Sequence, residues 1–326
     1  MLGHDWAVNM LVRHIADHNI QHAYLLTGPA GVGRQTLALR FAQALNCSQP
    51  PEPGKPCLEC RNCIQIARKQ HPDLSIIQSE RRGETLRVEQ IRELQQGLSL
   101  APYQARYRMA ILLRFEEAND SASNALLKTL EEPPDHVILI LTANCVDSLL
   151  PTIVSRCEVL NLRPLPIAEL APGLQAKWNI SPEKANLLAH LSNGCPGIVI
   201  QSIQQPNFLE RRHQILEEHL QLLKASLVER FAYADSIHKA NDKDLLPGLL
   251  EVWLSFWRDV MLCAAGSSAE ISNLDWVDDI QQLAALLDLN SLERIIASIL
   301  RTYDLLTFNI NPRLAIEVLL LDLPHI

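Results

Sequence analysis

Hydrophobic positions in the first 163 residues follow two alternating patterns. Short apolar or β-branched runs predict strands, and apolar residues spaced three or four apart predict helices between them. The predicted strands are Ala23–Thr27, Leu74–Gln78, Met109–Leu113, Val137–Thr142 and Cys157–Leu160, and the predicted helices are Gly33–Asn46, Leu86–Leu98 and Ser121–Glu132. Strands that alternate with helices pair in parallel through crossover connections, so this region predicts an α/β sheet.

Only helices are predicted after Arg163-Pro164-Leu165-Pro166, where the strand pattern ends. The first are short and cover Ala168–Lys177, Pro182–Ser192 and Gly197–Gln204. Long amphipathic helices follow, over Phe208–Phe231, Leu245–Ala264, Asp279–Leu286, Ser291–Leu306 and Pro312–Leu323. We therefore expect three domains, at 1–163 with a cysteine-rich insert at 47–63, at 164–205 and at 206–326.

The composition is that of an ordinary globular protein. The chain has 326 residues, of which 48% are hydrophobic and 20% charged, and its formal net charge is −8. This balance argues against disordered, collagen-like and disulfide-scaffold proteins, and against nucleic-acid binding over the whole surface. The start, MLGHDWAVNM, lacks a signal-peptide pattern, and no apolar run approaches the ~18 residues of a membrane span. We expect a cytoplasmic protein without a membrane partner.

Four cysteines form a cluster with the spacing of metal ligands, namely Cys47, Cys57, Cys60 and Cys63. Cytoplasmic proteins rarely carry structural disulfides, and four thiolates so close in sequence fit tetrahedral zinc. A redox dithiol at Cys60 and Cys63 and an iron–sulfur site are the alternatives. Because the Pro/Gly-rich segment Ser48–Pro56 has little core of its own, we expect a structural Zn²⁺ site that staples the insert.

A glycine-rich loop follows the first predicted strand, with Gly28, Gly31 and Gly33 before the next helix. Such a loop cradles phosphates with backbone N–H groups at a helix N-terminus. Gly28 and Gly33 have the spacing of a phosphate loop, but Arg34 replaces its lysine and Gln35 replaces its Ser or Thr. Arg is bulkier than Lys, and Gln is a poor Mg²⁺ ligand. The segment is either a plain strand-to-helix turn or, as we favour, a degenerate phosphate loop with weak or no ATP binding.

The second signature of a nucleotide hydrolase is also missing. Magnesium-dependent hydrolysis needs carboxylates at the end of a strand. The strand Met109–Leu113 is followed by Arg114 and Phe115, and only then by Glu116 and Glu117. The two glutamates either act from shifted positions or, as we favour, begin a solvated helix. We expect no intrinsic ATPase activity.

Arg156 lies in Ser155-Arg156-Cys157, after a helix-like stretch and before the last predicted strand. An arginine at this place has two interpretations. It either forms a surface ion pair or reaches into a neighbouring subunit, where it stabilises charge on a transferring phosphate.

Together these motifs resemble one family. The segment Asn124–Pro134, with the sequence NALLKTLEEPP, is similar to the hallmark of bacterial clamp-loader subunits of the AAA+ family. The degenerate loop, the four cysteines, Ser155-Arg156-Cys157 and the late Asn311-Pro312-Arg313 extend the resemblance over nearly the whole chain. They resemble the delta-prime branch of DNA polymerase III clamp loaders, because the ATP-hydrolysing gamma/tau branch should keep the Lys, Ser/Thr and Asp-Glu that this chain has lost.

The resemblance implies an AAA+ module with a five-stranded parallel sheet, a small helical lid domain and a C-terminal helical collar domain. It also implies a ring-like complex with delta and gamma/tau subunits, which loads the sliding clamp onto primer-template DNA in replication. In that complex Arg156 would be an arginine finger acting in trans on a gamma/tau ATP site. Thr142 or Asn144 would take the first-sensor position, and Gly194-Cys195-Pro196-Gly197 lacks the second-sensor arginine of hydrolysing relatives.

Two other functions stay open at this point. One is an active ATPase of the gamma/tau type that uses Glu116 or Glu117, and the other is a zinc-dependent nucleic-acid-binding module. Several cations either face solvent or contact DNA phosphates rather than bases, and these are Arg81, Arg82, Arg106 and Arg108.

Overall fold

A computed structural model describes residues 2–80, 84–205, 207–239, 245–307 and 311–326 of the chain. They form two compact units. The first comprises Met1–Gly173 with Gly194–Ile198, and the second comprises Leu174–Asn193 with Val199–Ile326. The expected domain boundaries at 163 and 205 stay predictions.

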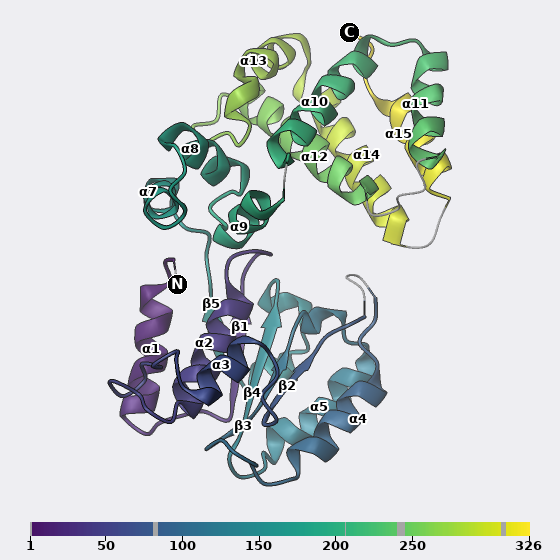
Figure 1. Cartoon of the computed structure of the whole chain (residues 1–326). Helices are drawn as coiled ribbons and strands as arrows, with labels where there is room; N and C mark the ends of the chain where they lie inside the picture. The colour runs from purple at the N-terminus through teal and green to yellow at the C-terminus, as the bar shows by residue number, and fades with distance from the viewer. Residues whose placement is uncertain (1, 81–83, 206, 240–244, 308–310) are drawn as a thin grey trace. The chain divides into compact units, whose positions relative to one another are not determined.

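The first unit is built on a five-stranded parallel sheet, as the sequence pattern predicts (Figure 1). The strands lie in the order β2-β3-β4-β1-β5 and cover Leu74–Ile77, Arg108–Leu112, Val137–Ala143, Ala23–Thr27 and Glu158–Asn161. Every residue of β4 and of β1 is buried, because these strands lie inside the sheet with helices over both faces. The carboxyl ends of all the strands therefore meet at one edge.

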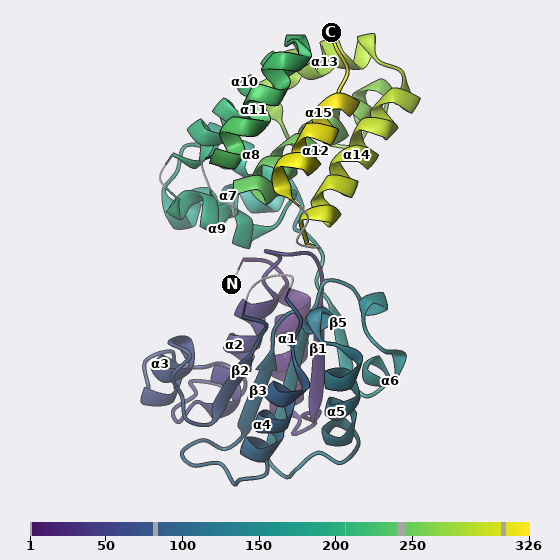
Figure 2. The same ribbon diagram turned by 90° about the vertical axis from the view of Figure 1, so that its right-hand side faces the viewer.

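Helices cover the two faces of this sheet (Figures 1 and 2). On one face lie α1 (Asp5–Ala16), α2 (Arg34–Asn46) and α3 (Arg61–Ala67), and on the other lie α4 (Val88–Leu98), α5 (Asp120–Glu131) and α6 (Pro151–Val154). Successive strand residues point to opposite faces, so Tyr24 and Leu26 pack with α1 and α2, whereas Leu25 packs with α4 and α5. Two hydrophobic cores result. Short 3₁₀ helices cover Phe115–Glu117 and Val146–Ser148.

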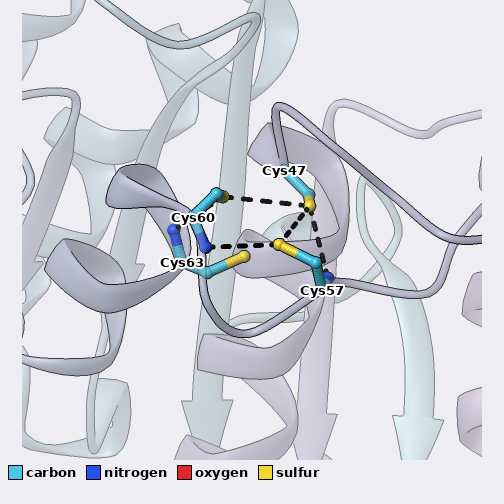
Figure 3. A group of neighbouring side chains, drawn as sticks. All are labelled: Cys47, Cys57, Cys60 and Cys63. Atoms are coloured by element: carbon cyan, nitrogen blue, oxygen red, sulfur yellow. Dashed lines mark hydrogen bonds between the residues drawn. The ribbon is translucent and has the colours of Figure 1, made fainter.

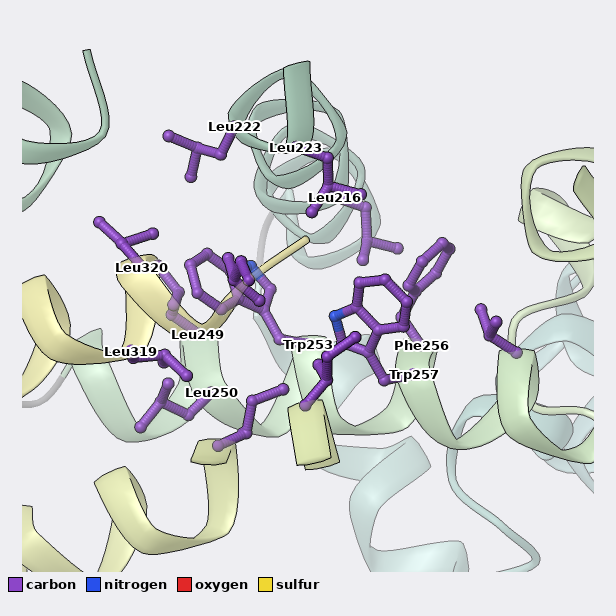
Figure 4. Close-up of a cluster of buried hydrophobic side chains, with 14 of the residues drawn as sticks. Leu216, Leu222, Leu223, Leu249, Leu250, Trp253, Phe256, Trp257, Leu319 and Leu320 are labelled. Atoms are coloured by element: carbon purple, nitrogen blue, oxygen red, sulfur yellow. The ribbon is translucent and has the colours of Figure 1, made fainter. Parts of the chain in front are cut away.

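Helices alone follow, as expected. They are α7 (Ile167–Trp178), α8 (Pro182–Leu191), α9 (Pro196–Gln204), α10 (Phe208–Lys224), α11 (Leu227–Lys239), α12 (Leu245–Ala264), α13 (Val277–Leu286), α14 (Leu289–Thr307) and α15 (Pro312–Asp322), with a 3₁₀ turn at Leu274–Trp276. The core of the second unit surrounds Trp253, Phe256 and Trp257 of α12, against leucines of α10 and α15 (Figure 4). In the described part of the chain, every helix is too short or too polar to cross a bilayer.

The prediction of one helix over Phe208–Phe231 is wrong. The structure ends α10 at Lys224 and begins α11 at Leu227. Ser226 and Glu229 form a reciprocal cap, in which the Ser226 N–H donates to the Glu229 carboxylate at 2.7 Å and the Glu229 N–H approaches Ser226 Oγ at 3.4 Å. Such a Ser-x-x-Glu pair marks the start of a new helix. The helical spacing of the leucines continues across this break, so the hydrophobic pattern alone predicted one helix.

Candidate nucleotide and metal sites

The glycine-rich loop joins the carboxyl end of β1 to α2. Gly28, Gly31 and Gly33 all have positive φ, at 138°, 78° and 117°. A Cβ atom on Gly28 would lie 2.2 Å from the carbonyl oxygen of Leu162, so glycine is required there for packing as well as for conformation. The loop therefore has the backbone character that the sequence predicts.

The side chain of Arg34 is bound within the unit. Arg34 opens α2, with Gln35 next, and its Nη2 donates to Oδ1 of Asn144 at 2.9 Å. Asn144 directly follows β4, at the same edge of the sheet. Burial raises the pKa of the Cys195 thiol, and the positive charge of Arg34 opposes that rise. The guanidinium is therefore bound at the end of β4 and acts electrostatically on the Cys195 thiol.

That turn, Gly194–Ile198, packs directly on the loop. The Gly197 N–H donates to the Gly31 carbonyl at 2.7 Å, and a Cβ atom on Gly197 would lie 2.6 Å from the same oxygen. On Gly31 a Cβ atom would lie 2.6 Å from Ile198. From another side, Nε2 of His4 lies 2.9 Å from the Val32 carbonyl. The loop backbone is therefore contacted closely by other parts of its own unit.

At the end of β3 stands a charged cluster that the sequence analysis did not foresee. Arg114 has a positive φ of 51°, and its N–H donates to Thr142 Oγ1 at 3.0 Å. Its Nε lies 3.0 Å from both carboxylate oxygens of Glu117, and its Nη2 donates to Ser79 Oγ at 2.9 Å. Ser79 follows β2 closely. Its position after a strand is the only signal in the sequence that it could belong to this cluster. The carboxylate of Glu117 is therefore already paired with the guanidinium of Arg114 in the same chain.

Arg156 follows α6 and forms an ion pair. Its Nη2 lies 2.8 Å from a carboxylate oxygen of Glu131, and its Nη1 donates to the Thr152 carbonyl at 2.8 Å. The two side chains are 35% and 51% exposed. Such a pair contributes only about 0–1 kcal/mol, so exchanging Glu131 for another partner costs little.

The four predicted metal ligands lie together (Figure 3). All four sulfurs are within 4.8 Å of one another, and a tetrahedral Zn²⁺ with Zn–S bonds of about 2.3 Å places its sulfurs about 3.8 Å apart. Cys47 follows α2, Cys57 lies in the connecting loop, and Cys60 caps α3, which contains the buried Cys63. The cysteines can therefore hold one metal ion.

Backbone donors surround these sulfurs. The N–H groups of Cys57, Cys60 and Cys63 point to the sulfurs of Cys47, Cys57 and Cys60, at 3.3, 3.3 and 3.5 Å. Burial opposes ionisation of Cys60, but hydrogen bonds from Ser48 and Cys63 outweigh it and lower the pKa of that thiol to about 6. Burial raises the pKa of the Cys47 and Cys63 thiols. N–H groups that donate to sulfur stabilise thiolates, the form that binds metal.

The remaining candidate cations have local roles in the first unit. Arg106 lies over the ring of Tyr107, 5.3 Å from its centroid, and Arg108 donates to the carbonyls of Leu100 and Ala101. Arg81 and Arg82 lie outside the described residues. No direct DNA contact follows from these positions.

Both units match a known family. Residues 3–166 match the family described as DNA polymerase III, delta subunit, and residues 206–325 match its C-terminal domain. A DNA polymerase III subunit delta' of Pseudomonas aeruginosa is 38% identical over 209 residues, 63% of this chain and 62% of that protein. The alignment thus spans less than two thirds of the Pseudomonas protein.

A second relative aligns with nearly the whole length of this chain. A DNA polymerase III subunit delta' of Bacillus subtilis is 28% identical over 97% of this chain and 94% of its own length. A DNA polymerase III subunit tau/gamma of Haemophilus influenzae is 33% identical over 174 residues, 53% of this chain and 25% of that protein.

Proposed function

Because the chain belongs to the family of DNA polymerase III delta-prime subunits, we propose that it acts as the non-hydrolysing stator of a clamp loader. In this function it assembles in the cytoplasm with delta and gamma/tau subunits and helps load the sliding clamp onto primer-template DNA. Residues 1–163 supply the AAA+ domain, residues 164–205 the lid and residues 206–326 the collar. Exposed leucine and valine side chains on α15 suit the collar role, and they are Leu314, Val318 and Leu321.

One observation supports the absence of hydrolysis most directly. At the two positions where a hydrolase needs a free lysine and free carboxylates, this chain has arginines whose side chains are hydrogen-bonded to other residues of the same unit. Arg34 donates to Asn144, and Arg114 is paired with Glu117 and Ser79. A Mg²⁺–nucleotide complex needs carboxylate and hydroxyl oxygens at these places, and a guanidinium repels the ion.

Hydrolysis of Mg-ATP by the purified chain tests this proposal. We expect turnover at the level of a buffer blank, and no change with Glu116→Gln or Glu117→Gln. Turnover by the chain alone that either substitution abolishes would establish the active gamma/tau-type ATPase instead. The same chain should restore clamp loading to a complex that lacks it, which shows that the preparation is competent.

We propose further that Arg156 acts in trans on a neighbouring gamma/tau ATP site. Its half-exposed position after α6 and its weak pairing with Glu131 support the proposal, because both allow it to exchange partners. Arg156→Ala and Arg156→Lys should each lower ATP hydrolysis at the adjacent gamma/tau site by about 10³-fold or more, the usual contribution of such a finger, and so remove that site's share of the hydrolysis by the reconstituted complex. Arg92→Ala, on an exposed residue of α4, is the matched control. Wild-type hydrolysis with both Arg156 variants excludes the assignment.

The metal we propose for the four cysteines is Zn²⁺ in a structural role. All-thiolate donors and the closeness of the sulfurs favour zinc with no open coordination position. When bound, the ion would offset half of the negative charge of the four thiolates and hold the insert closed. The chain's own residues fix the insert to α2, because Gln43 donates to the Cys63 carbonyl and Asn62 donates to the Asn46 carbonyl.

A further inference from the structure

The cysteine insert and the helix α3 that follows it expose a face that has no role in the proposed function. We define this outer face as Leu58, Arg61, Ile64, Arg68 and Lys69. Leu58 is 45% exposed and Ile64 is 40% exposed, and both are large apolar side chains. Arg61, Arg68 and Lys69 are exposed around them. The face thus combines an apolar centre with cations.

Helical geometry places these residues together. Positions 61, 64 and 68 fall on one side of α3 and its C-cap, whereas Cys63 and Ile66 on the opposite side are buried. Leu58 lies two residues before Cys60, the N-cap of α3, and its side chain is exposed as well. Leu58 has a positive φ of 67°, an uncommon conformation for a bulky residue. The loop therefore holds an apolar side chain outward at a conformational cost.

The insert is held firmly on the sheet domain. Gln43 of α2 donates to the Cys63 carbonyl at 2.7 Å, and Asn62 donates to the Asn46 carbonyl at 2.9 Å. Ile66 is 1% exposed and belongs to the core of the first unit. A face that is already ordered loses little conformational entropy on binding, which favours a recognition role.

The charges of the outer face are unbalanced. In the described part of the chain, Arg61, Arg68 and Lys69 form no ion pair. Glu59 is the acidic residue nearest to Arg61 in sequence, and Asp73 is the one nearest to Arg68 and Lys69. The Asp73 carboxylate accepts three backbone N–H groups, and Glu52 is paired with Lys55 at 2.6 Å. On a chain with a net charge of −8, such an excess of cations is a local feature. It complements an acidic ligand.

We propose that the outer face is a docking site for an acidic peptide segment of a partner protein, with one or two bulky apolar residues as its anchor. The apolar residues would pack on Leu58 and Ile64, and the carboxylates would pair with Arg61 and Arg68. A single-stranded nucleic acid fits less well, because bases bind by stacking on aromatic rings and residues 47–71 contain no Phe, Tyr or Trp.

Fluorescence anisotropy with the full-length chain tests the proposal. The probe is a short fluorescein-labelled peptide rich in Asp and Glu, with two adjacent leucines. We expect saturable binding that weakens at high salt, and Arg61→Glu, Arg68→Glu and Ile64→Ser should each weaken it by about tenfold. Arg92→Glu, at an exposed position of α4 over the other face of the sheet, is the control variant, and circular dichroism and metal content verify that each variant is folded.

Three results would overturn the proposal. The first is no binding of the peptide by folded wild-type chain at micromolar concentration. The second is equal or tighter binding of an oligothymidylate of similar length, which would assign the face to nucleic acid. The third is unchanged peptide binding in the arginine variants together with weaker retention of metal, which would mean that the cations only offset the charge of the thiolates.

Discussion

The Nε atom of Arg114 lies 3.0 Å from each carboxylate oxygen of Glu117, at the end of β3. The same arginine donates to Ser79 beyond β2, so the ends of two neighbouring strands are joined through one guanidinium. The side chains of Arg114 and Glu117 are only 28% and 13% exposed. Charge-assisted hydrogen bonds at this depth contribute more than surface pairs do.

Removing one member of this pair should destabilise the first unit. We expect Glu117→Gln and Arg114→Ala each to lower the free energy of unfolding by about 1–3 kcal/mol, because a partly buried charge loses its partner. Urea denaturation followed by circular dichroism measures the change. Glu93→Gln, at an exposed position of α4, should differ from wild type by less than about 0.5 kcal/mol. An unchanged free energy of unfolding for Glu117→Gln would mean that the Arg114–Glu117 pair contributes nothing to stability.

Loss of a metal ligand should release the metal and loosen the insert. We expect Cys60→Ser and Cys63→Ser to remove bound zinc and to lower the free energy of unfolding by more than about 2 kcal/mol, as loss of a structural metal does. Elemental analysis and thermal denaturation with and without a chelator measure both effects. Cys145→Ser, at an exposed thiol, is the control. A wild type that melts identically with and without chelator would contradict a structural metal.

The contact between Gly197 and Gly31 can be probed with a matched pair of glycines. Gly197→Ala places a methyl group 2.6 Å from a backbone oxygen, and we expect a loss of about 1–3 kcal/mol. Gly97→Ala, in α4, meets nothing within 4 Å and should stabilise by about 0.5–1 kcal/mol. Both sites are helical, so the difference between their unfolding free energies isolates the steric term. Equal changes of the unfolding free energy in the two variants would show that the turn around Gly197 moves to accommodate the methyl group at no cost.

Asp73 organises the loop that follows α4. Its carboxylate is buried and accepts the N–H groups of Tyr103, Gln104 and Ala105 at 2.7, 2.7 and 2.9 Å. Burial raises the pKa of Asp73, but the three hydrogen bonds outweigh it and hold the pKa below its ordinary value of 3.8. This stabilisation is present above pH 3.8 and is lost as the pH falls through the lower folded-state pKa.

We expect Asp73→Asn to cost about 1–3 kcal/mol at neutral pH, because the amide offers one acceptor oxygen instead of two. Urea titrations at a series of pH values compare the variant with wild type. The difference should shrink once the wild-type carboxylate is protonated. A difference that stays constant to the lowest pH would show that the charge of Asp73 is irrelevant.

His219 should give the second unit a pH-dependent stability. Trp257 Nε1 donates to its Nε2 at 2.8 Å, and the ring is fully buried. Burial, aided by the positive charge of Arg230, lowers the pKa of His219 from 6.5 to about 3. At a pH between these two pKa values, His219 is protonated in the unfolded chain and neutral in the folded chain. The free energy of unfolding should therefore fall as the pH is lowered from 6.5 towards 3.

Tryptophan fluorescence during urea denaturation measures this slope. His219→Gln keeps an acceptor for Trp257 but cannot take up the proton, so its unfolding free energy should depend less on pH in the same range. His325→Gln, at an exposed position, should retain the wild-type slope. If the unfolding free energy depended on pH in the same way for all three proteins, His219 would be protonated as easily in the folded state as in the unfolded state.

Local patterns were sufficient for most of the fold. The run at Ala23–Thr27 is β1 itself, and the other predicted strands differ from the observed ones by a residue or two, because buried parallel strands need continuous apolar runs. Helices α1 and α3 were not predicted. The break at Ala225 was concealed because the leucine spacing continues across it, although Ser226 and Glu229 carried the signal.

By itself the sequence determined the α/β sheet, the helical remainder and the gathering of the four cysteines, because hydrophobic spacing and short ligand spacing act over a few residues. Only the tertiary structure decided the partners of the two arginines. Arg34 meets Asn144 across 110 residues, and Arg114 meets Ser79 across 35. These pairs depend on the strand order β2-β3-β4-β1-β5, which brings distant strand ends to one edge of the sheet, and no local pattern encodes that order.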